Sequence, residues 1–244
     1  MNKLIGSDVE YWKTDSTDLD TYELALSSIG TKSQPSIGPY GPYHSDQVWA
    51  ERATRPHASL SDLLEDLEWG KIHLETVMGM PLRGVDYIEQ HFSEETHPFL
   101  HQQSREFGCA PDLWMGRYRS VPPVIKARAL REAGAHIHFS LPREYTDTLY
   151  DTRCPRTGEH VVMERGNAIK RVAQRIGDAL APFHVWEHPT ERPWYRKPGV
   201  YRLKPYGIEY RSLGAGILSD ADLLVSVYGT AFDILNDIWK GHTS

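Results

Sequence analysis

Short stretches of alternating apolar and polar residues recur along the chain and predict β-strands. They cover residues 3–12, 47–51, 135–141 and 207–213. Successive side chains of a strand point to opposite faces, so each stretch has one apolar and one polar face. This pattern is typical of antiparallel sheets with a core on one side only.

Three longer stretches place apolar residues at helical spacing, over residues 59–78, 167–183 and 219–240. The first and third begin with a serine followed three residues later by an aspartate, which resembles a capping box: Ser59 opens one and Ser219 the other. A glycine follows each of these two helices, as expected at a helix C-terminus.

The segments between these elements lack a clear period. We expect residues 13–27 to form a loop or hairpin, and residues 29–43 and 186–206 to form loops, because these segments are polar or rich in glycine and proline. Residues 143–164 are expected to be irregular, and residues 82–131 allow no firm assignment.

Composition indicates a globular protein of one domain, residues 1–244, with 40% hydrophobic residues and a formal charge of −6. This acidic balance gives no direct support for nucleic-acid binding. No apolar stretch is long enough for a membrane span, and the N-terminus does not resemble a signal peptide. Two widely separated cysteines form no disulfide framework, so we expect a cytoplasmic protein.

The polar faces of three predicted strands carry unusual residues. A solvated face is usually rich in lysine, serine and threonine, whereas carboxylates and imidazoles suit divalent cations. Unrelated solvated faces are the alternative reading. The polar pairs, one on each strand, are Asp8 with Glu10, His136 with His138, and Glu209 with Arg211.

A basic segment precedes the last of these strands. Arginine suits phosphate because its planar fork donates two parallel hydrogen bonds, and prolines would hold such a segment in place. An exposed basic loop is the simpler alternative. No P-loop and no nucleophile elbow is present. The basic residues are Arg192, Arg196, Lys197, Arg202, Lys204 and Arg211.

At these residues the chain resembles the phage-type carboxylate–amine ligases, or amidoligases. They are a branch of the glutamine synthetase and glutamate–cysteine ligase superfamily. The similar segments follow one another along nearly the whole chain, and the last is the most specific. They are residues 5–10, 29–32, 107–112, 134–138 and 195–211.

The resemblance implies an α+β fold of the glutamine synthetase type, with a curved, mainly antiparallel sheet and helices on its convex face. It also implies bound ATP and Mg²⁺ or Mn²⁺. The metal ligands would be Glu10, with Asp8 beside it, Glu51, with Asp46 as a further candidate in the same segment, His136 and Glu209. The segment around Glu51 departs from the usual family pattern. The nucleotide phosphates would contact Arg196, Arg202, Lys204, Arg211 and His138.

The implied reaction joins a carboxylate to an amine. Transfer of the γ-phosphoryl group of ATP to the carboxylate gives an acyl phosphate, whose leaving group is phosphate rather than oxide. An amine then attacks to form an amide. Arg211, Arg196 and Glu51 are the expected catalytic residues.

Two other functions fit parts of the sequence. A zinc or iron hydrolase or oxygenase would use His136 and His138, but would leave the basic segment unexplained. A binding module without catalysis would retain the fold alone. The sequence does not identify the small-molecule or peptide carboxylate and amine substrates. If the protein is phage-encoded, we expect it in the host cytoplasm.

Overall fold

The computed structural model describes residues 2–105, 112–114, 117–119, 130–153, 160–184 and 197–241. Its main sheet is built from strands drawn from both halves of the chain. These strands are β1 (Ile5–Lys13), β2 (Gly30–Thr31), β3 (Gln34–Gly38), β4 (Gly41–Asp46), β5 (Trp49–Ala53), β6 (Leu82–Arg83), β8 (Asp112–Trp114), β9 (Arg117–Arg119), β11 (Ala135–Ser140), β14 (Val200–Lys204) and β15 (Gly207–Tyr210).

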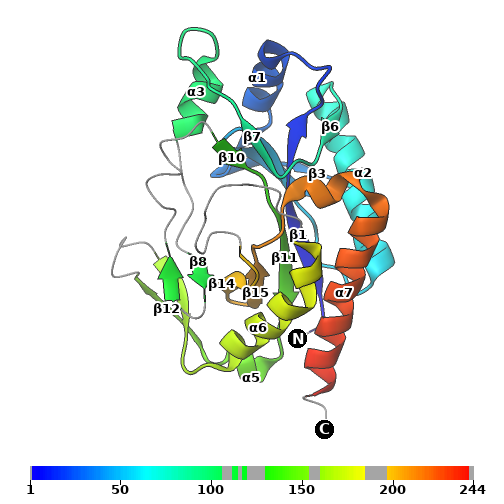
Figure 1. The fold of residues 1–244 in the computed structure, drawn as a ribbon, viewed down its shortest axis with the longest axis vertical. Coiled ribbons are helices and arrows are strands. Elements are labelled where there is room, and N and C mark those ends of the chain that lie inside the picture. The colour runs from blue at the N-terminus through cyan, green and yellow to red at the C-terminus, as the bar shows by residue number, and fades with distance from the viewer. Residues whose placement is uncertain are drawn as a thin grey trace.

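The sheet has the strand order β2-β3-β4-β5-β1-β11-β15-β14-β8-β9, and β6 pairs with the end of β1. Within the described residues only β2 and β4 pair in parallel. A mixed α and β structure with a mostly antiparallel sheet, as the sequence predicted, is therefore confirmed. The N-terminal strand β1 lies centrally, between β5 and β11 (Figure 1).

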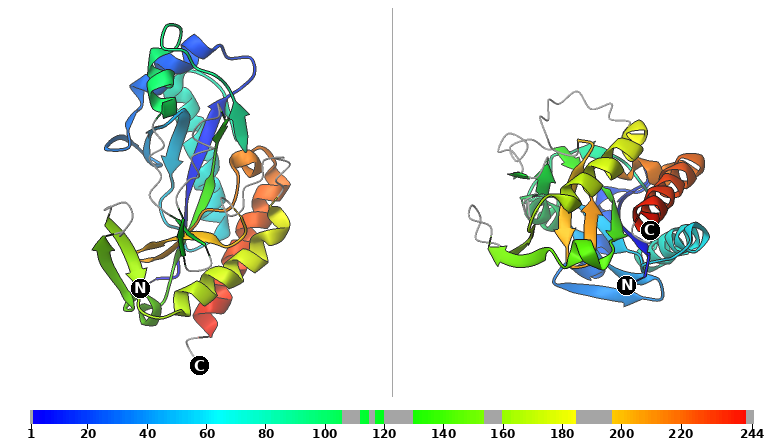
Figure 2. Two further views of the ribbon diagram at one scale, coloured as in Figure 1. Left: turned by 60° about the vertical axis from the view of Figure 1, so that its left-hand side comes forward. Right: turned by 90° about the horizontal axis from the view of Figure 1, so that it is seen from below.

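The described helices and two small sheets complete the fold (Figure 2). Two-stranded sheets form between β7 (Tyr87–Glu89) and β10 (Leu130–Glu132), and between β12 (Leu149–Arg153) and β13 (His160–Glu164). No helix in the described part of the chain is long and apolar enough to cross a membrane. The helices are α1 (Leu19–Ser28), α2 (Leu60–Met78), α3 (Pro98–Arg105), α5 (Arg143–Thr146), α6 (Ala168–Leu180) and α7 (Ala221–Lys240), with short 3-10 turns at Ala181–Phe183 and Ala215–Ser219.

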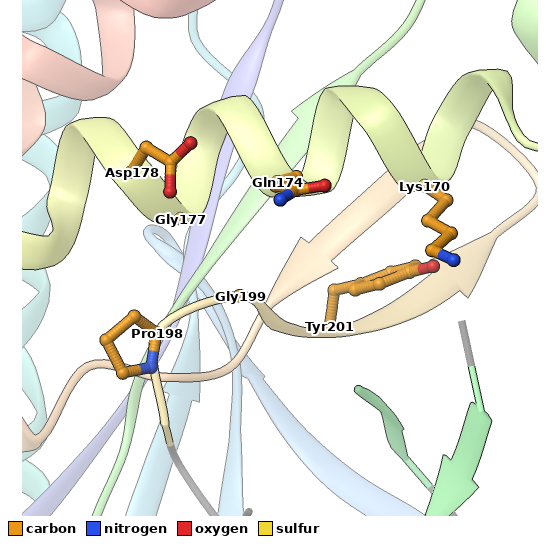
Figure 3. A pocket seen from close by; sticks show the side chains of 7 residues that line it. All are labelled: Lys170, Gln174, Gly177, Asp178, Pro198, Gly199 and Tyr201. Carbon is orange, nitrogen blue, oxygen red and sulfur yellow. The ribbon is translucent and has the colours of Figure 1, made fainter. Parts of the chain in front are cut away.

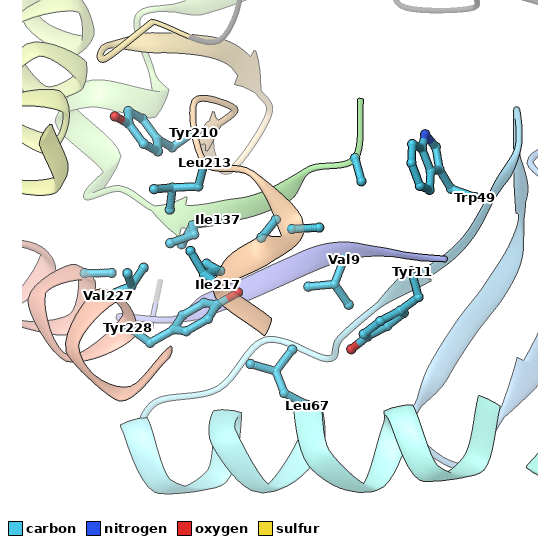
Figure 4. Packing of buried hydrophobic residues seen from close by; sticks show 14 of the residues in the cluster. Val9, Tyr11, Trp49, Leu67, Ile137, Tyr210, Leu213, Ile217, Val227 and Tyr228 are labelled. Atoms are coloured by element: carbon cyan, nitrogen blue, oxygen red, sulfur yellow. The ribbon is translucent and has the colours of Figure 1, made fainter. Parts of the chain in front are cut away.

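The core lies between one face of the sheet and the helices α2, α6 and α7. Val9 of β1 and Ile137 of β11 are fully buried, and they pack in one cluster with Leu67 of α2 and Val227 of α7 (Figure 4). Tyr228 of α7 also lies in this cluster. The odd-numbered positions of β1 and β11 thus face the helices, which leaves their even-numbered positions on the other face.

The helix termini follow from capping. Ser59 Oγ accepts a hydrogen bond from the backbone N–H of Asp62 at 3.2 Å, and Gly79 ends α2 in the left-handed region at φ 68°. The predicted start and end of this helix are confirmed. The prediction for α7 was wrong by one residue, because Asp220 rather than Ser219 accepts the capping hydrogen bond, from Leu223 N.

The prediction of a loop or hairpin at residues 13–27 was wrong, because this segment contains most of α1, capped by Asp18. The predicted loop at 29–43 was also wrong. It contains β2, β3 and the start of β4, and Gly41 takes a φ of 104° at the tight turn between β3 and β4. Glycine and proline marked the turn here but did not prevent edge strands from forming.

Two further segments predicted without regular structure contain strands. Residues 143–164 include α5 and the hairpin strands β12 and β13, and residues 186–206 include β14. In β14 the basic residues Arg202 and Lys204 alternate with Tyr201 and Leu203. The alternation of apolar and basic residues in this strand was not recognised in the sequence, because the whole segment was read as a basic loop. The predicted turn at 107–112 lies outside the described residues except for position 112, which begins β8.

Candidate functional site

The strand register brings the polar pairs together on the sheet face opposite the helices. Residues directly opposite each other in antiparallel strands point to the same side, with Cβ atoms about 5 Å apart. The three predicted polar faces are therefore one continuous face. Its direct pairs are Asp8 with His136, His138 with Glu209, and Glu10 with Glu51.

Four of these six side chains are buried although they are charged or titratable, whereas Asp8 and His138 are half-buried. Glu209 is only 1% exposed, His136 4%, and Glu10 and Glu51 6% each. Acidic and basic side chains are almost never fully buried unless they are paired or bind an ion. A solvated polar face, the alternative reading of the sequence, does not fit this burial.

The first cluster combines Asp8, His138 and Glu209, each of which offers a ligand atom within 4.8 Å of the others. His138 Nε2 lies 2.9 Å from Asp8 Oδ2, and its Nδ1 contacts the hydroxyl of Tyr206. His136 is placed differently: its Nδ1 lies 3.5 Å from Glu209 Oε1. Of the two histidines, His138 thus belongs to the compact group of ligand atoms.

Three cations surround Glu209. Arg211 contacts its Oε1, Lys204 Nζ lies 2.7 Å from its Oε2, and Arg202 Nη1 lies 3.8 Å from the same oxygen. Burial alone would raise the pKa of Glu209, but these cations together with His136 hold it well below its usual value. Glu209 is therefore anionic at neutral pH, and three cations around one carboxylate favour a further anion such as phosphate.

The second cluster combines Glu10, Asp46 and Glu51, again with ligand atoms within 4.8 Å of one another. The backbone N–H of Gly134 donates to Glu10. Lys32 Nζ lies 2.7 Å from Asp46 and 4.0 Å from Glu51.

The carboxylates of the second cluster differ in their pKa. Burial raises the pKa of Glu51, and the neighbouring negative charge of Asp46 adds to the effect. Burial would also raise the pKa of Asp46, but the charge of Lys32 and hydrogen bonding outweigh it and lower this pKa. A divalent cation at this cluster would favour the ionised form of both groups.

Three residues beside these clusters, His44, Tyr206 and Lys32, were not among the site residues predicted from the sequence. His44 lies directly opposite Glu51 in the pairing of β4 with β5. Its signal was the alternation of Tyr43, His44, Ser45 and Asp46, which the prediction of a loop over 29–43 obscured.

A hollow of about 340 Å³ opens beside the first cluster, and Asp8, His138 and Tyr206 form part of its wall. A second hollow, of about 310 Å³, lies between α6 and the start of β14 and is lined by residues such as Lys170 and Tyr201 (Figure 3). No residue predicted for the site lines this second hollow. Only the first hollow adjoins the polar face.

The structure thus gathers most of the residues predicted for the site on one sheet face. Arg196, predicted for both catalysis and phosphate binding, lies outside the described residues. The gathered residues are Glu10, Glu51, His136, His138, Arg202, Lys204, Glu209 and Arg211.

The two clusters fit divalent cations by their chemistry. Their ligand atoms are mainly carboxylate oxygens with few imidazole nitrogens, which suits Mg²⁺ or Mn²⁺. Structural zinc sites instead use nitrogen and sulfur ligands. No family model, curated protein or solved structure matches the chain.

Proposed function

We propose that this protein is an ATP- and divalent-metal-dependent carboxylate–amine ligase with a glutamine synthetase-like fold. The observation that carries the proposal is a single buried sheet face with two acidic clusters and an adjoining group of three cations. Phosphoryl transfer needs this combination, because metal ions bridge phosphate oxygens and fixed cations offset the charge that develops.

The ligand atoms of two metal positions would come from different strands. Asp8, His138 and Glu209 would hold one ion, and Glu10, Asp46 and Glu51 another. When bound, such ions neutralise the phosphates of ATP and the attacking carboxylate. The chain positions both sets rigidly, because strands hold side chains more precisely than loops do.

The cations have a separate task. Arg211, Arg202 and Lys204 all approach one carboxylate, Glu209, so the positive charge gathered there exceeds the single negative charge of that group. We infer that they bind the transferring phosphoryl group of ATP. The bond from the γ-phosphorus to ADP breaks as a bond to the substrate carboxylate forms.

The acyl phosphate then reacts with an amine. The amine nitrogen attacks the carbonyl carbon, the carbon–oxygen bond to phosphate breaks, and the nitrogen loses a proton. The hollow beside Asp8, His138 and Tyr206 offers room next to the first cluster for part of a substrate. Burial of the site would protect the acyl phosphate from water.

The cationic group also argues against a zinc or iron hydrolase. Arg211 Nη1 lies 3.2 Å from His136 Nδ1, so the two histidines are separated by their partners rather than directed at one ion. A hydrolase of that kind would have no need for three cations on Glu209.

The test is ADP and phosphate release by the full chain with ATP, Mg²⁺ or Mn²⁺ and a pooled set of carboxylates and amines. We expect release that requires metal and added substrates. Glu209→Gln should lower the rate on the order of 100-fold, because it removes a proposed ligand of the first metal ion. The matched control Glu68→Gln, at an exposed position of α2, should not.

Metal-dependent ATP binding is measured in the same samples, because a missing substrate would abolish turnover but not binding. Absence of any metal-dependent ATP binding in the folded protein would refute the ligase.

A further inference from the structure

His44 is a buried histidine that approaches Glu51 at ion-pair distance, 3.4 Å, without a well-aligned hydrogen bond. It is 9% exposed, and neither ring nitrogen makes a hydrogen bond to any residue that the structure describes. A buried polar group normally has a partner, and an exception points to an ion or water in the functional state. The second acidic cluster is the neighbour that can supply one.

The ring points toward that cluster. His44 Nε2 lies 3.4 Å from Glu51 Oε2, and that oxygen also lacks a hydrogen bond within the described part of the chain. Two ligands of one octahedral ion, each about 2.1 Å from it, lie about 3 Å apart. The separation of these two atoms is therefore compatible with a shared ion.

The register explains why the ring lies there. Glu10, Glu51 and His44 are directly opposite one another on the adjacent strands β1, β5 and β4, so they form a row across one face. Asp46 lies two residues after His44 on the same strand and the same face. The row thus places one imidazole next to Glu51, a member of the compact group of ligand atoms formed by Glu10, Asp46 and Glu51.

We propose that His44 is the nitrogen ligand of a mixed nitrogen and oxygen metal site with Glu10, Asp46 and Glu51, and that it makes this site select a transition-metal dication over Mg²⁺. Imidazole binds first-row transition ions well, whereas Mg²⁺ prefers oxygen ligands alone. This rests on the proposed function, in which Glu10 and Glu51 bind metal.

Lys32 has a related role. Its ammonium lies 2.7 Å from Asp46, and its side chain is 64% exposed. An exposed, flexible lysine can leave when a dication enters, because the ion replaces its charge. Lys32 therefore balances the charge of the acidic cluster in the metal-free protein.

The alternative is that His44 is charged and only holds Glu51 in place. Under that arrangement, removing the ring would weaken binding of every dication to a similar extent. A nitrogen ligand instead predicts an unequal loss, with a large effect on Mn²⁺ and a small one on Mg²⁺. The comparison between the two ions thus separates a ligand from a positioning residue.

The experiment titrates the full chain with MnCl₂ without ATP and follows free Mn²⁺ by electron paramagnetic resonance, with Mg²⁺ as competitor. We expect His44→Asn to weaken Mn²⁺ binding on the order of 10–100-fold. Mg²⁺ binding should change less than about threefold. His91→Asn, at an exposed position, is the matched control.

A spectroscopic measurement identifies the ligand directly. In a His138→Asn background, which removes the imidazole of the first cluster, the electron spin echo of bound Mn²⁺ should show a coordinated nitrogen. That signal should disappear when His44→Asn is added. His44→Gln serves as a second variant, and thermal unfolding of the metal-free proteins establishes that each one is folded.

Equal losses of Mn²⁺ and Mg²⁺ binding, or a nitrogen signal that persists without His44, would overturn the inference and leave the ligase standing. Loss of Mn²⁺ selectivity in a protein that never binds ATP would support the metal site and refute the ligase. A folded protein that binds no dication would overturn both.

Discussion

Gly70 lies on the buried face of α2, directly against the guanidinium group of Arg52. A Cβ atom added at position 70 would lie 1.9 Å from Arg52 Cζ and 2.2 Å from its Nε. The guanidinium has little freedom to move away. It forms a buried ion pair with Asp66 and donates a 2.6 Å hydrogen bond to the carbonyl oxygen of Tyr40.

Two effects of Gly70→Ala oppose each other. Alanine favours an α-helix over glycine by about 1 kcal/mol. Displacing Arg52, however, disrupts a buried ion pair, which costs about 3–5 kcal/mol. The second effect is larger, so we expect a net destabilisation of about 2–4 kcal/mol and a Tm lower by about 4–16 °C.

Thermal and urea unfolding of the purified variant measures this change. The matched control is Gly229→Ala in α7, where an added Cβ would have only Leu60 Cδ2 within 4 Å, at 3.8 Å. That variant should be neutral or more stable by up to about 1 kcal/mol. If Gly70→Ala proved as stable as Gly229→Ala, Arg52 would not be fixed against α2, and the reasoning would fail.

Three smaller predictions concern pH, packing and capping. Burial lowers the pKa of His184, which hydrogen-bonds to Tyr210, to about 4, so the folded state binds fewer protons than the unfolded state between about pH 6.5 and 4. The free energy of unfolding should fall by up to about 3 kcal/mol as the pH is lowered across that window. Measured by urea unfolding, this dependence on pH should be weaker in His184→Leu, and an equally steep dependence in the variant would contradict the prediction. Gly177→Ala would place a Cβ 2.8 Å from Gly199 Cα and should lower the free energy of unfolding, measured thermally, by about 1–3 kcal/mol. If the variant were as stable as the wild type, the backbone at Gly199 could move away without loss of stability. Ser59→Ala should cost about 1 kcal/mol by removing the α2 cap, and Ser59→Thr should recover most of that loss.

The sequence predicted elements best where local chemistry decides them. The helix at 59–78 has both an apolar stripe and a serine cap, and the structure places it at Leu60–Met78 with Ser59 as its cap. The loop predicted at 29–43 failed because β3 and β4 are stabilised by partners in the sheet rather than by their own sequence. Strand propensity depends on context, and an edge hairpin rich in glycine and proline gives little local signal.

The polar pairs on β1, β11 and β15 were readable from the sequence, because alternation alone places Asp8 with Glu10 on one side of a strand. Their assembly into one site was not readable. Strand order and register decide that Glu10 faces Glu51 and that His138 faces Glu209, and these pairings join residues more than 40 positions apart. His44 entered the site only through the pairing of β4 with β5. The sequence by itself determined which faces carry the chemistry, whereas the tertiary structure decided which residues share it, because register is set by packing of the whole sheet against its helices.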